Sequence, residues 1–223
     1  MSRRQPLSAA RSLTRRNPCR EPRARFLLIC EGEVTEPEYF AYVKEALRDH
    51  LLVIEISKTH GNPLQLVREA VARSRSAASK ARKDRDDHLR YDQIWCVTDV
   101  DSHPQLSEAK MLAEKNGVHL AISNPCFELW PLLHIVDRRC QMTSREMQAE
   151  LRQHMPGYEK SLDCAKLRGH YATARERAMS ILKQHERDDN LVDSNPSTNV
   201  WQLVDELLCS KQRADGRVTT SPL

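Results

Sequence analysis

The sequence has no long apolar run, and this absence excludes one class of protein. Nowhere in its 223 residues does an apolar stretch approach the roughly 18 residues that a membrane-spanning helix needs. The N-terminal region also lacks the apolar centre of a secretory signal, so we expect no such signal. Hydrophobic residues make up 39% of the chain and charged residues 30%, which is typical of a soluble, helix-rich protein. We therefore expect a cytoplasmic protein with no membrane partner.

Several motifs of metal and nucleotide chemistry are also absent. The seven cysteines include no CxxC pair and the nine histidines no HExxH motif, so we expect no structural zinc site. The odd cysteine count favours a reducing compartment. There is no Walker loop and no GxGxxG, which argues against an ATPase. No period of about 20–50 residues repeats, so the chain is not a solenoid.

Charge is present but unevenly distributed. The formal net charge is +4, yet residues 1–25 hold eight arginines and a single acid, giving this segment +7 and the remaining 198 residues −3. A uniformly basic protein that coats nucleic acid is therefore not expected. Residues 1–24 have no hydrophobic periodicity, so the sequence predicts a disordered basic tail. Such a tail either remains solvated, touching phosphate at most, or acts as a transit peptide in a eukaryotic source.

Short apolar runs alternate with helical periodicity between residues 25 and 136. The first run, RFLLIC, is apolar almost throughout, as expected for a strand buried on both faces. Strands alternating with helices predict an α/β fold, with a mostly parallel sheet of about four strands and helices on both faces. The predicted strands cover residues 25–30, 51–56, 93–98 and 118–123.

Residues typical of helix boundaries separate these runs. Two T-x-x-E sequences predict capping boxes. Three Asn-Pro pairs predict helix starts, with Asn as N-cap and Pro in the first turn, and one Asn-Gly pair predicts a helix end. In chain order these signals are Thr35–Glu38, Asn62-Pro63, Asn116-Gly117, Asn124-Pro125, Thr143–Glu146 and Asn195-Pro196.

The strand-like runs stop near residue 136. Apolar residues then recur at steps of three and four, from Leu167 to Ile181, which predicts an amphipathic helix. The sequence therefore predicts an α/β domain over 25–136, a C-terminal helical subdomain over 137–209 that packs on it, and a loose tail over 210–223.

Acidic residues follow two of the predicted strands. Glu31 and Gly32 come directly after the first strand, and Asp99 and Asp101 end the third. Ligands of open parallel sheets bind outside the carboxyl ends of the strands, and residues two apart on a strand face the same side. Carboxylates there can hold Mg²⁺ (or Mn²⁺), and Gly32 leaves backbone room for a ligand. Alternatively, Asp99 and Asp101 only end the strand or cap the next helix.

Four segments make this pattern more specific. An E-G pair after the first strand and a later strand ending in D-x-D resemble the Toprim arrangement of topoisomerases, primases and some nucleases. Within that group the chain is similar to the RloB family, so residues 25–136 would form a Toprim-like domain. The matching segments, in the family's order, are CEGEVTEPEYF (30–40), TDVD (98–101), SNPCFELW (123–130) and NPSTNV (195–200).

The resemblance implies roles for these residues. Glu31 corresponds to the Toprim acid, a metal ligand or general base, and Asp99 and Asp101 to the metal-binding pair. Family members occur beside restriction–modification genes and in abortive-infection systems, usually with an ATPase partner encoded nearby, so the resemblance implies prokaryotic anti-phage defence.

Three further side chains are candidates for the same site. Glu36 and Glu128 lie early in predicted helices, where each either lines the site or only favours the helix dipole. Lys160 resembles a Lys-containing segment of the family and either contacts phosphate or is a solvated loop lysine.

The sequence leaves three functions open. The first is a Mg²⁺-dependent nuclease that hydrolyses phosphodiester bonds in DNA or RNA, with Glu31, Asp99, Asp101 and Glu128 as catalytic residues. The second is a non-catalytic, Toprim-like effector subunit that binds nucleic acid or its ATPase partner. The third is another Toprim chemistry, such as nucleotidyl transfer. A topoisomerase is not expected, because none of the five tyrosines has the context of a nucleophile.

Overall fold

Helices and strands alternate over the first half of the chain. The computed structural model describes residues 24–48, 52–58, 61–100, 105–187, 194–215 and 223. The elements are β1 (Ala24–Cys30), α1 (Thr35–Leu47), β2 (Leu52–Lys58), α2 (Pro63–Asp84), the short 3-10 helix η1 (Asp87–Leu89), β3 (Gln93–Asp99), α3 (Leu106–Asn116), β4 (His119–Asn124), α4 (Leu129–Ile135), α5 (Ser144–His154), the 3-10 helix η2 (Cys164–Leu167), α6 (Tyr171–Arg187), β5 (Ser197–Thr198) and α7 (Val200–Asp215).

The strands form one sheet in the order β2-β1-β3-β4-β5. The first four strands are parallel, as predicted, and each lies within two residues of its predicted bounds. The short β5 pairs antiparallel with the end of β4 and was not predicted, because two residues carry no periodicity. The predicted α/β class with a mostly parallel sheet and C-terminal helices is confirmed.

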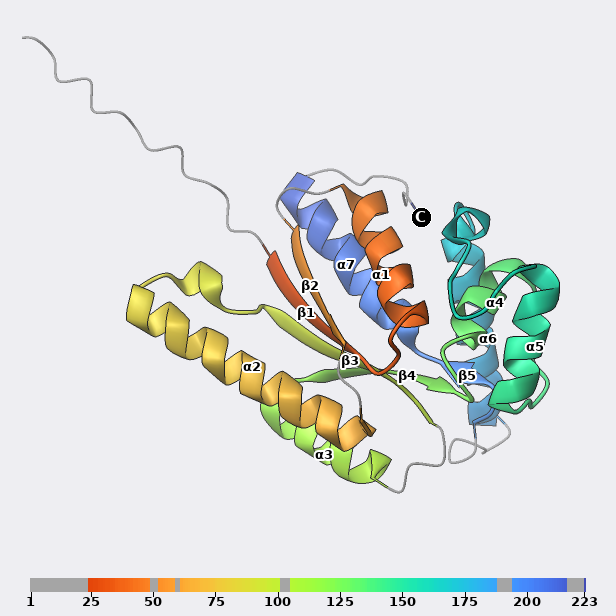
Figure 1. Ribbon diagram of the computed structural model, residues 1–223, viewed down its shortest axis with the longest axis horizontal. Coiled ribbons are helices and arrows are strands. Elements are labelled where there is room, and N and C mark those ends of the chain that lie inside the picture. The colour runs from red at the N-terminus through yellow and green to blue at the C-terminus, as the bar shows by residue number, and fades with distance from the viewer. Residues whose placement is uncertain (1–23, 49–51, 59–60, 101–104, 188–193, 216–222) are drawn as a thin grey trace, which may run out of the picture.

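Both faces of the sheet are covered by helices. In Figure 1, α1 and α7 lie above the sheet and α2 and α3 below it. Leu27 and Ile29 of β1 belong to the hydrophobic cluster shared with α2 and α3, whereas Phe26 and Leu28 belong to the cluster shared with α1 and α7. All four side chains are at most 1% exposed. The continuous apolar run of β1 is thus explained by burial on both sides.

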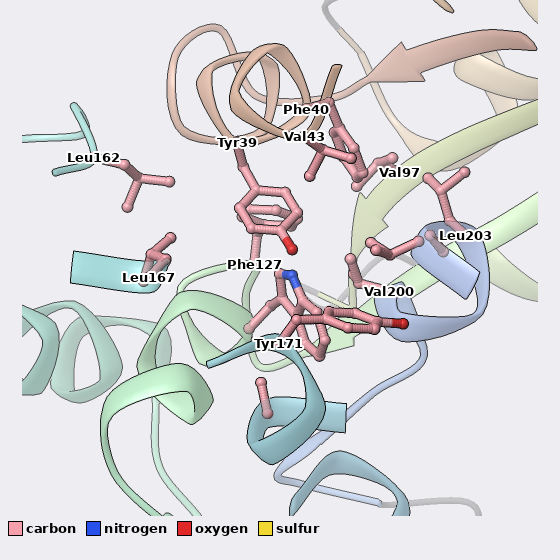
Figure 2. Packing of buried hydrophobic residues seen from close by; sticks show 14 of the residues in the cluster. Tyr39, Phe40, Val43, Val97, Phe127, Leu162, Leu167, Tyr171, Val200 and Leu203 are labelled. Carbon is pink, nitrogen blue, oxygen red and sulfur yellow. The ribbon is translucent and has the colours of Figure 1, made fainter. Parts of the chain in front are cut away.

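A cluster of aromatic rings joins the sheet to the helices that follow residue 136. The Trp130 ring of α4 meets Tyr39 of α1 and Tyr171 of α6 edge to face, with ring centroids 6.1 Å apart in both pairs. Figure 2 shows Tyr39, Phe127 and Tyr171 converging between these elements. One hydrophobic cluster therefore continues from β1 into the C-terminal helices.

Several predicted helix boundaries are confirmed. Asn62 accepts a hydrogen bond from the Gln65 backbone N–H and closes a capping box at the start of α2. Thr143 and Glu146 form the predicted capping box of α5. Gly117 ends α3 in the left-handed conformation (φ 65°), which glycine adopts at little cost.

Two predicted helix starts are wrong. Asn124 is the last residue of β4 and pairs with Ser197, and α4 begins only at Leu129. The Asn195 side chain bonds both the N–H and the C=O of Met142 (3.2 and 2.9 Å). Asn124 is thus part of the sheet and the Asn195 side chain is engaged by Met142, so neither caps the helix that follows it.

The ends of the chain are only partly described. Residues 1–23, most of the predicted basic tail, lie outside the described residues. Helix α7 continues to Asp215, past residue 209, where the sequence predicts the loose tail to begin. Among the described helices, none combines the length and apolar character needed to cross a bilayer.

His134 gives the fold a pH dependence that can be measured. This α4 residue is 3% exposed, and its Nδ1 lies 3.0 Å from the Trp130 carbonyl oxygen. Burial lowers the pKa of His134 from 6.5 to about 4, so only the unfolded chain takes up the proton between these values. Stability should therefore be complete above about pH 6.5 and fall by up to about 3 kcal/mol as the pH drops toward 4.

Urea unfolding of wild type and His134→Leu, measured between pH 7 and pH 4.5, tests this. The fall in unfolding free energy should be about 2 kcal/mol smaller in His134→Leu, and the exposed-site control His88→Leu should behave as wild type. An equal fall in all three proteins would contradict the assignment.

Candidate active site

The carboxyl ends of β1 and β3 meet where the chain changes from one face of the sheet to the other. The two strands are direct neighbours. Helix α1, which follows β1, packs on the Phe26 side of the sheet, whereas α3, which follows β3, packs on the Leu27 side. Connections that diverge in this way leave a crevice at the strand ends, where ligands of open α/β sheets bind.

Glu31 is fixed against the end of β3. Its backbone N–H continues the strand ladder by donating to the Val97 carbonyl (3.1 Å). Its Oε2 accepts hydrogen bonds from the Thr98 hydroxyl and from the Asp99 backbone N–H, the latter at 3.3 Å. Thr98 is only 1% exposed, so water does not compete for its hydroxyl. These bonds hold the Glu31 carboxylate beside Asp99.

Gly32 lets the Glu36 carboxyl approach the loop after β1. The Gly32 N–H donates to Glu36 Oε1 (3.1 Å), and a Cβ at position 32 would lie 1.9 Å from Glu36 Oε2. Any other residue at position 32 would therefore displace Glu36. Burial raises the pKa of Glu36, and the nearby charges of Glu128 and Glu31 raise it further.

Glu128 is a buried carboxylate with a charged partner. It is 3% exposed, and its Oε1 accepts hydrogen bonds from Lys160 Nζ (2.9 Å) and the Tyr158 hydroxyl (2.8 Å). Burial acts to raise the pKa of Glu128, but hydrogen bonds, the strongest from Lys160, outweigh it and leave that pKa below its usual value. Glu128 is therefore ionised at neutral pH. The Lys160 side chain remains 54% exposed and can still meet a ligand.

The predicted capping box of Thr35 and Glu38 is wrong. The start of α1 has no side-chain cap. Thr35 instead donates to the Lys160 carbonyl (2.8 Å), and Glu38 accepts from the Leu162 N–H (2.8 Å). Both side chains form hydrogen bonds with the backbone of the loop that carries Lys160. These bonds attach the loop to α1 and place Lys160 over the strand ends.

The structure brings six of the seven predicted residues to one pocket. The pocket has a volume of about 290 Å³ and also contains Glu33, Val34 and Thr35. The predicted residues that line it are Glu31, Gly32, Glu36, Asp99, Glu128 and Lys160. Asp101, the seventh, lies outside the described residues.

The donors of this pocket suit a hard divalent cation. Glu31 and Asp99 offer carboxylate oxygens at adjacent strand ends. Within the described ranges, no group of three or more His, Cys, Asp or Glu side chains could enclose an ion. Mg²⁺ typically takes one or two carboxylates and completes its shell with water and substrate phosphate. The donor set therefore fits such an open site better than a closed protein cage.

Sequence reasoning did not assign Thr98 and Tyr158 to the site. Thr98 orients Glu31, and Tyr158 bonds Glu128. A polar residue inside a buried apolar strand needs a partner, so Thr98 could have been recognised from its position. No local pattern marks Tyr158, because its partner Glu128 is 30 residues away.

A family model described as RloB-like protein matches residues 26–207, which include every described residue of the pocket. No curated protein and no solved structure matches the chain.

Proposed function

The chain belongs to the RloB-like family, and from that premise we propose that it is a divalent-metal-dependent nuclease acting in phage defence. The single observation that carries this proposal is the convergence of Glu31, Asp99 and Lys160 in one pocket at the switch between β1 and β3. Carboxylates and a cation at this position provide what phosphodiester hydrolysis requires, namely ligands for a metal and a contact for phosphate.

Each side chain has a separate task in this proposal. Glu31 and Asp99, together with Asp101, would hold Mg²⁺ or Mn²⁺. When bound, such an ion supplies charge neutralisation at the scissile phosphate and an acidified water. Thr98 keeps the Glu31 carboxylate oriented, as hydrogen bonds to metal ligands commonly do. Lys160, held by Glu128, presents a positive charge to the phosphate.

The biological setting is part of the same proposal. We propose that the protein works in the prokaryotic cytoplasm with an ATPase encoded nearby, and that DNA or RNA is its substrate. The chain itself has no Walker loop, so ATP hydrolysis would come from the partner. The carboxylate pocket would repel phosphate until a cation is bound, which makes the metal a requirement for substrate binding as well as for chemistry.

A cleavage assay tests the proposal directly. The purified chain, alone and with the ATPase, is incubated with labelled DNA and RNA in Mg²⁺, Mn²⁺ or EDTA. We expect cleavage in either metal, none in EDTA, and none with Asp99→Asn, which keeps the shape of the side chain but removes its charge. The matched control is Asp84→Asn, an exposed position at the end of α2, which should cleave as wild type.

The outcomes separate this function from its alternative. Equal residual cleavage in wild type and Asp99→Asn would show that the activity is a contaminant and would overturn the nuclease proposal. The alternative is a non-catalytic subunit that binds nucleic acid or the ATPase. The Glu128–Lys160 ion pair is the observation that favours this alternative, because it engages Glu128, which the nuclease hypothesis from the sequence counted as catalytic. Phage protection without any cleavage would support it.

A further inference from the structure

A second pocket lies at the opposite end of the sheet, where β1 begins. Its volume is also about 290 Å³. In contrast to the carboxylate pocket, its charged lining residues are all basic. The residues that line it are Arg25, Arg73, Ser76, Ala77, Lys80, Leu89 and Tyr91.

This basic pocket is separate from the carboxylate site. Arg25 lies near the start of β1, and Glu31 directly follows the end of the same strand. Six residues of extended chain span about 20 Å, so the two pockets open at different ends of the molecule. Figure 1 shows the C-terminal end of α2 and η1 close to the start of β1, on the far side from α4 and α5.

One face of α2 builds the wall of the basic pocket. Arg73, Ser76, Ala77 and Lys80 are spaced three, one and three residues apart, which places them on the same side of a helix. The two small residues between the cations leave open space where longer side chains would fill the gap. The helix therefore presents two positive charges on either side of a hollow.

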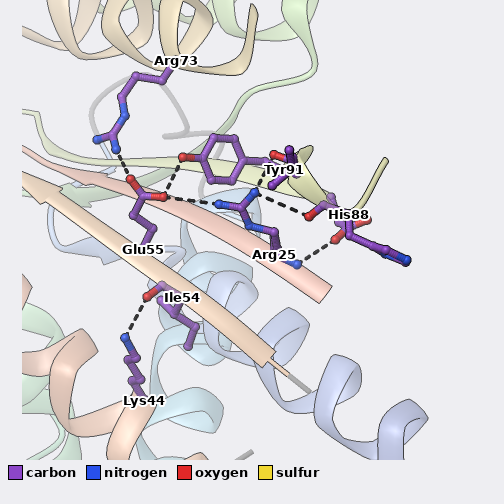
Figure 3. A network of polar contacts seen from close by, with 9 residues as sticks. Arg25, Lys44, Ile54, Glu55, Arg73, His88 and Tyr91 are labelled. Atoms are coloured by element: carbon purple, nitrogen blue, oxygen red, sulfur yellow. Dashed lines mark hydrogen bonds and ion pairs between the residues drawn. The ribbon is translucent and has the colours of Figure 1, made fainter. Parts of the chain in front are cut away.

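A single carboxylate is shared by the two arginines of the pocket. Glu55 of β2 accepts a hydrogen bond from Arg73 and one from the Tyr91 hydroxyl (2.6 Å), and it lies 3.8 Å from Arg25 Nη2. Figure 3 shows Arg73, Tyr91 and Arg25 converging on this carboxylate. The Arg25 and Arg73 side chains are only 22% and 26% exposed.

The charges in this network do not balance. The three cations that line the pocket, Arg25, Arg73 and Lys80, and their ion-pair partner Glu55 have a net charge of +2, and the Asp92 carboxylate bonds the backbone N–H of Arg25. Lys80 forms no ion pair with any part of the chain that the structure describes. The exposed Lys80 therefore adds an unpaired charge beside Arg25 and Arg73, which are partly desolvated and share one carboxylate, and partly desolvated cations are costly without enough anions. The pocket therefore has an excess of positive charge that a bound anion would neutralise.

Arg25 is held in place before any ligand arrives. Its guanidinium donates to the Leu89 carbonyl oxygen and lies 4.9 Å from the centre of the Tyr91 ring. Its backbone N–H donates to Asp92 Oδ2 (2.7 Å). A side chain fixed in this way loses little conformational entropy on binding, which favours affinity.

We propose that this basic pocket binds phosphate, supplied either by a nucleic-acid backbone or by a nucleotide. A net charge of +2 matches a phosphate group, and guanidinium groups favour phosphate oxygens. The chain that leads into β1 adds seven arginines and one glutamate in residues 1–23, so positive charge continues from the pocket along the sequence. This inference requires no cleavage and stands independently of the nuclease proposal.

Binding in EDTA tests the inference, because the carboxylate site then holds no metal. The probes are inorganic phosphate, ATP, and a short fluorescein-labelled single-stranded DNA with its RNA counterpart. Thermal unfolding measures the first two and fluorescence anisotropy the last two. Phosphate should raise the Tm of wild type by a few degrees, since it binds only the folded chain.

Two pairs of variants on α2 locate the effect. Lys80→Glu should weaken binding of the phosphate-containing probes about tenfold. Lys83→Glu makes the same charge change at an exposed position outside the pocket and should leave their binding unchanged. Ser76→Leu, which fills the hollow without changing charge, should also weaken binding, whereas the exposed-site control Ser79→Leu should not.

Each outcome decides the inference. If Lys80→Glu and Ser76→Leu lose affinity for the oligonucleotides alone, the phosphate comes from a nucleic-acid backbone. If these variants lose affinity for ATP, and ATP competes with the oligonucleotides in wild type, the phosphate comes from a nucleotide. Both support the site. The inference would be overturned if phosphate left the Tm unchanged and wild type and the four variants bound the oligonucleotides equally well. It would also be overturned if Lys80→Glu and Lys83→Glu lost the same amount of affinity.

Discussion

Glu31→Gln should lower metal-dependent cleavage by about 10²–10³-fold, because a metal-held phosphate loses several kcal/mol of transition-state stabilisation when a charged ligand is removed. The glutamine oxygen can still accept the hydrogen bonds from Thr98 and the Asp99 N–H, so the local structure should be preserved. The measurement is the single-turnover rate of cleavage at saturating Mg²⁺, with circular dichroism to verify folding.

A matched control separates the role of Glu31 from a general effect of charge. Glu45 lies on the exposed side of α1, and Glu45→Gln makes the same chemical change outside the pocket. It should cleave at the wild-type rate. Equal cleavage by Glu31→Gln and Glu45→Gln would show that Glu31 takes no part in cleavage and would contradict the proposed metal site.

Trp130→Ala should reduce the free energy of unfolding by about 3–5 kcal/mol, the usual cost of removing a large buried aromatic side chain. Trp130 has no exposed surface, and its ring contacts Tyr39 of α1 and Tyr171 of α6. Because Trp130 connects α1 to the C-terminal helices, we expect its loss to destabilise the α/β part and the helical part of the chain together, in a single unfolding transition. Urea unfolding measures this, in a Trp201→Phe background that leaves Trp95 of β3 as the fluorescent tryptophan of Trp130→Ala, with far-UV circular dichroism as the second signal.

Two comparisons make the Trp130 result decisive. Met111→Ala removes a large apolar side chain that is 65% exposed, and it should change stability by less than about 0.5 kcal/mol. Two separate transitions in Trp130→Ala, with the Trp95 signal unchanged in midpoint, would contradict a shared core. In that case the predicted boundary at residue 136 would divide two independently folding units.

The position of the candidate carboxylate pocket was predictable because its first members follow buried strands. Continuous apolar runs identify β1 and β3 from the sequence alone, and acids directly after such runs lie at the carboxyl edge of a parallel sheet. The adjacency of β1 and β3 was not predictable, because strand order depends on which strands pair across distant parts of the chain. Only this order brings Glu31 and Asp99 together.

Local hydrogen-bond signals were reliable only where no distant partner competed. Asn62 and Thr143 cap the helices that follow them, as predicted. Thr35 and Asn195 carry the same kind of signal, yet their side chains bond backbone groups 125 and 53 residues away. A buried backbone group left without a partner costs more than a missing helix cap, so the tertiary contact prevails.

The sequence by itself determined the α/β class, the four parallel strands and the acids at their ends, because burial of apolar runs and the period of side chains are local properties. The tertiary structure alone decided that Glu128 and Lys160 face those acids, and that Arg25 and Arg73 share one carboxylate at the other end. Charges separated along the chain interact only after packing fixes their distance, and the burial that comes with packing strengthens the interaction.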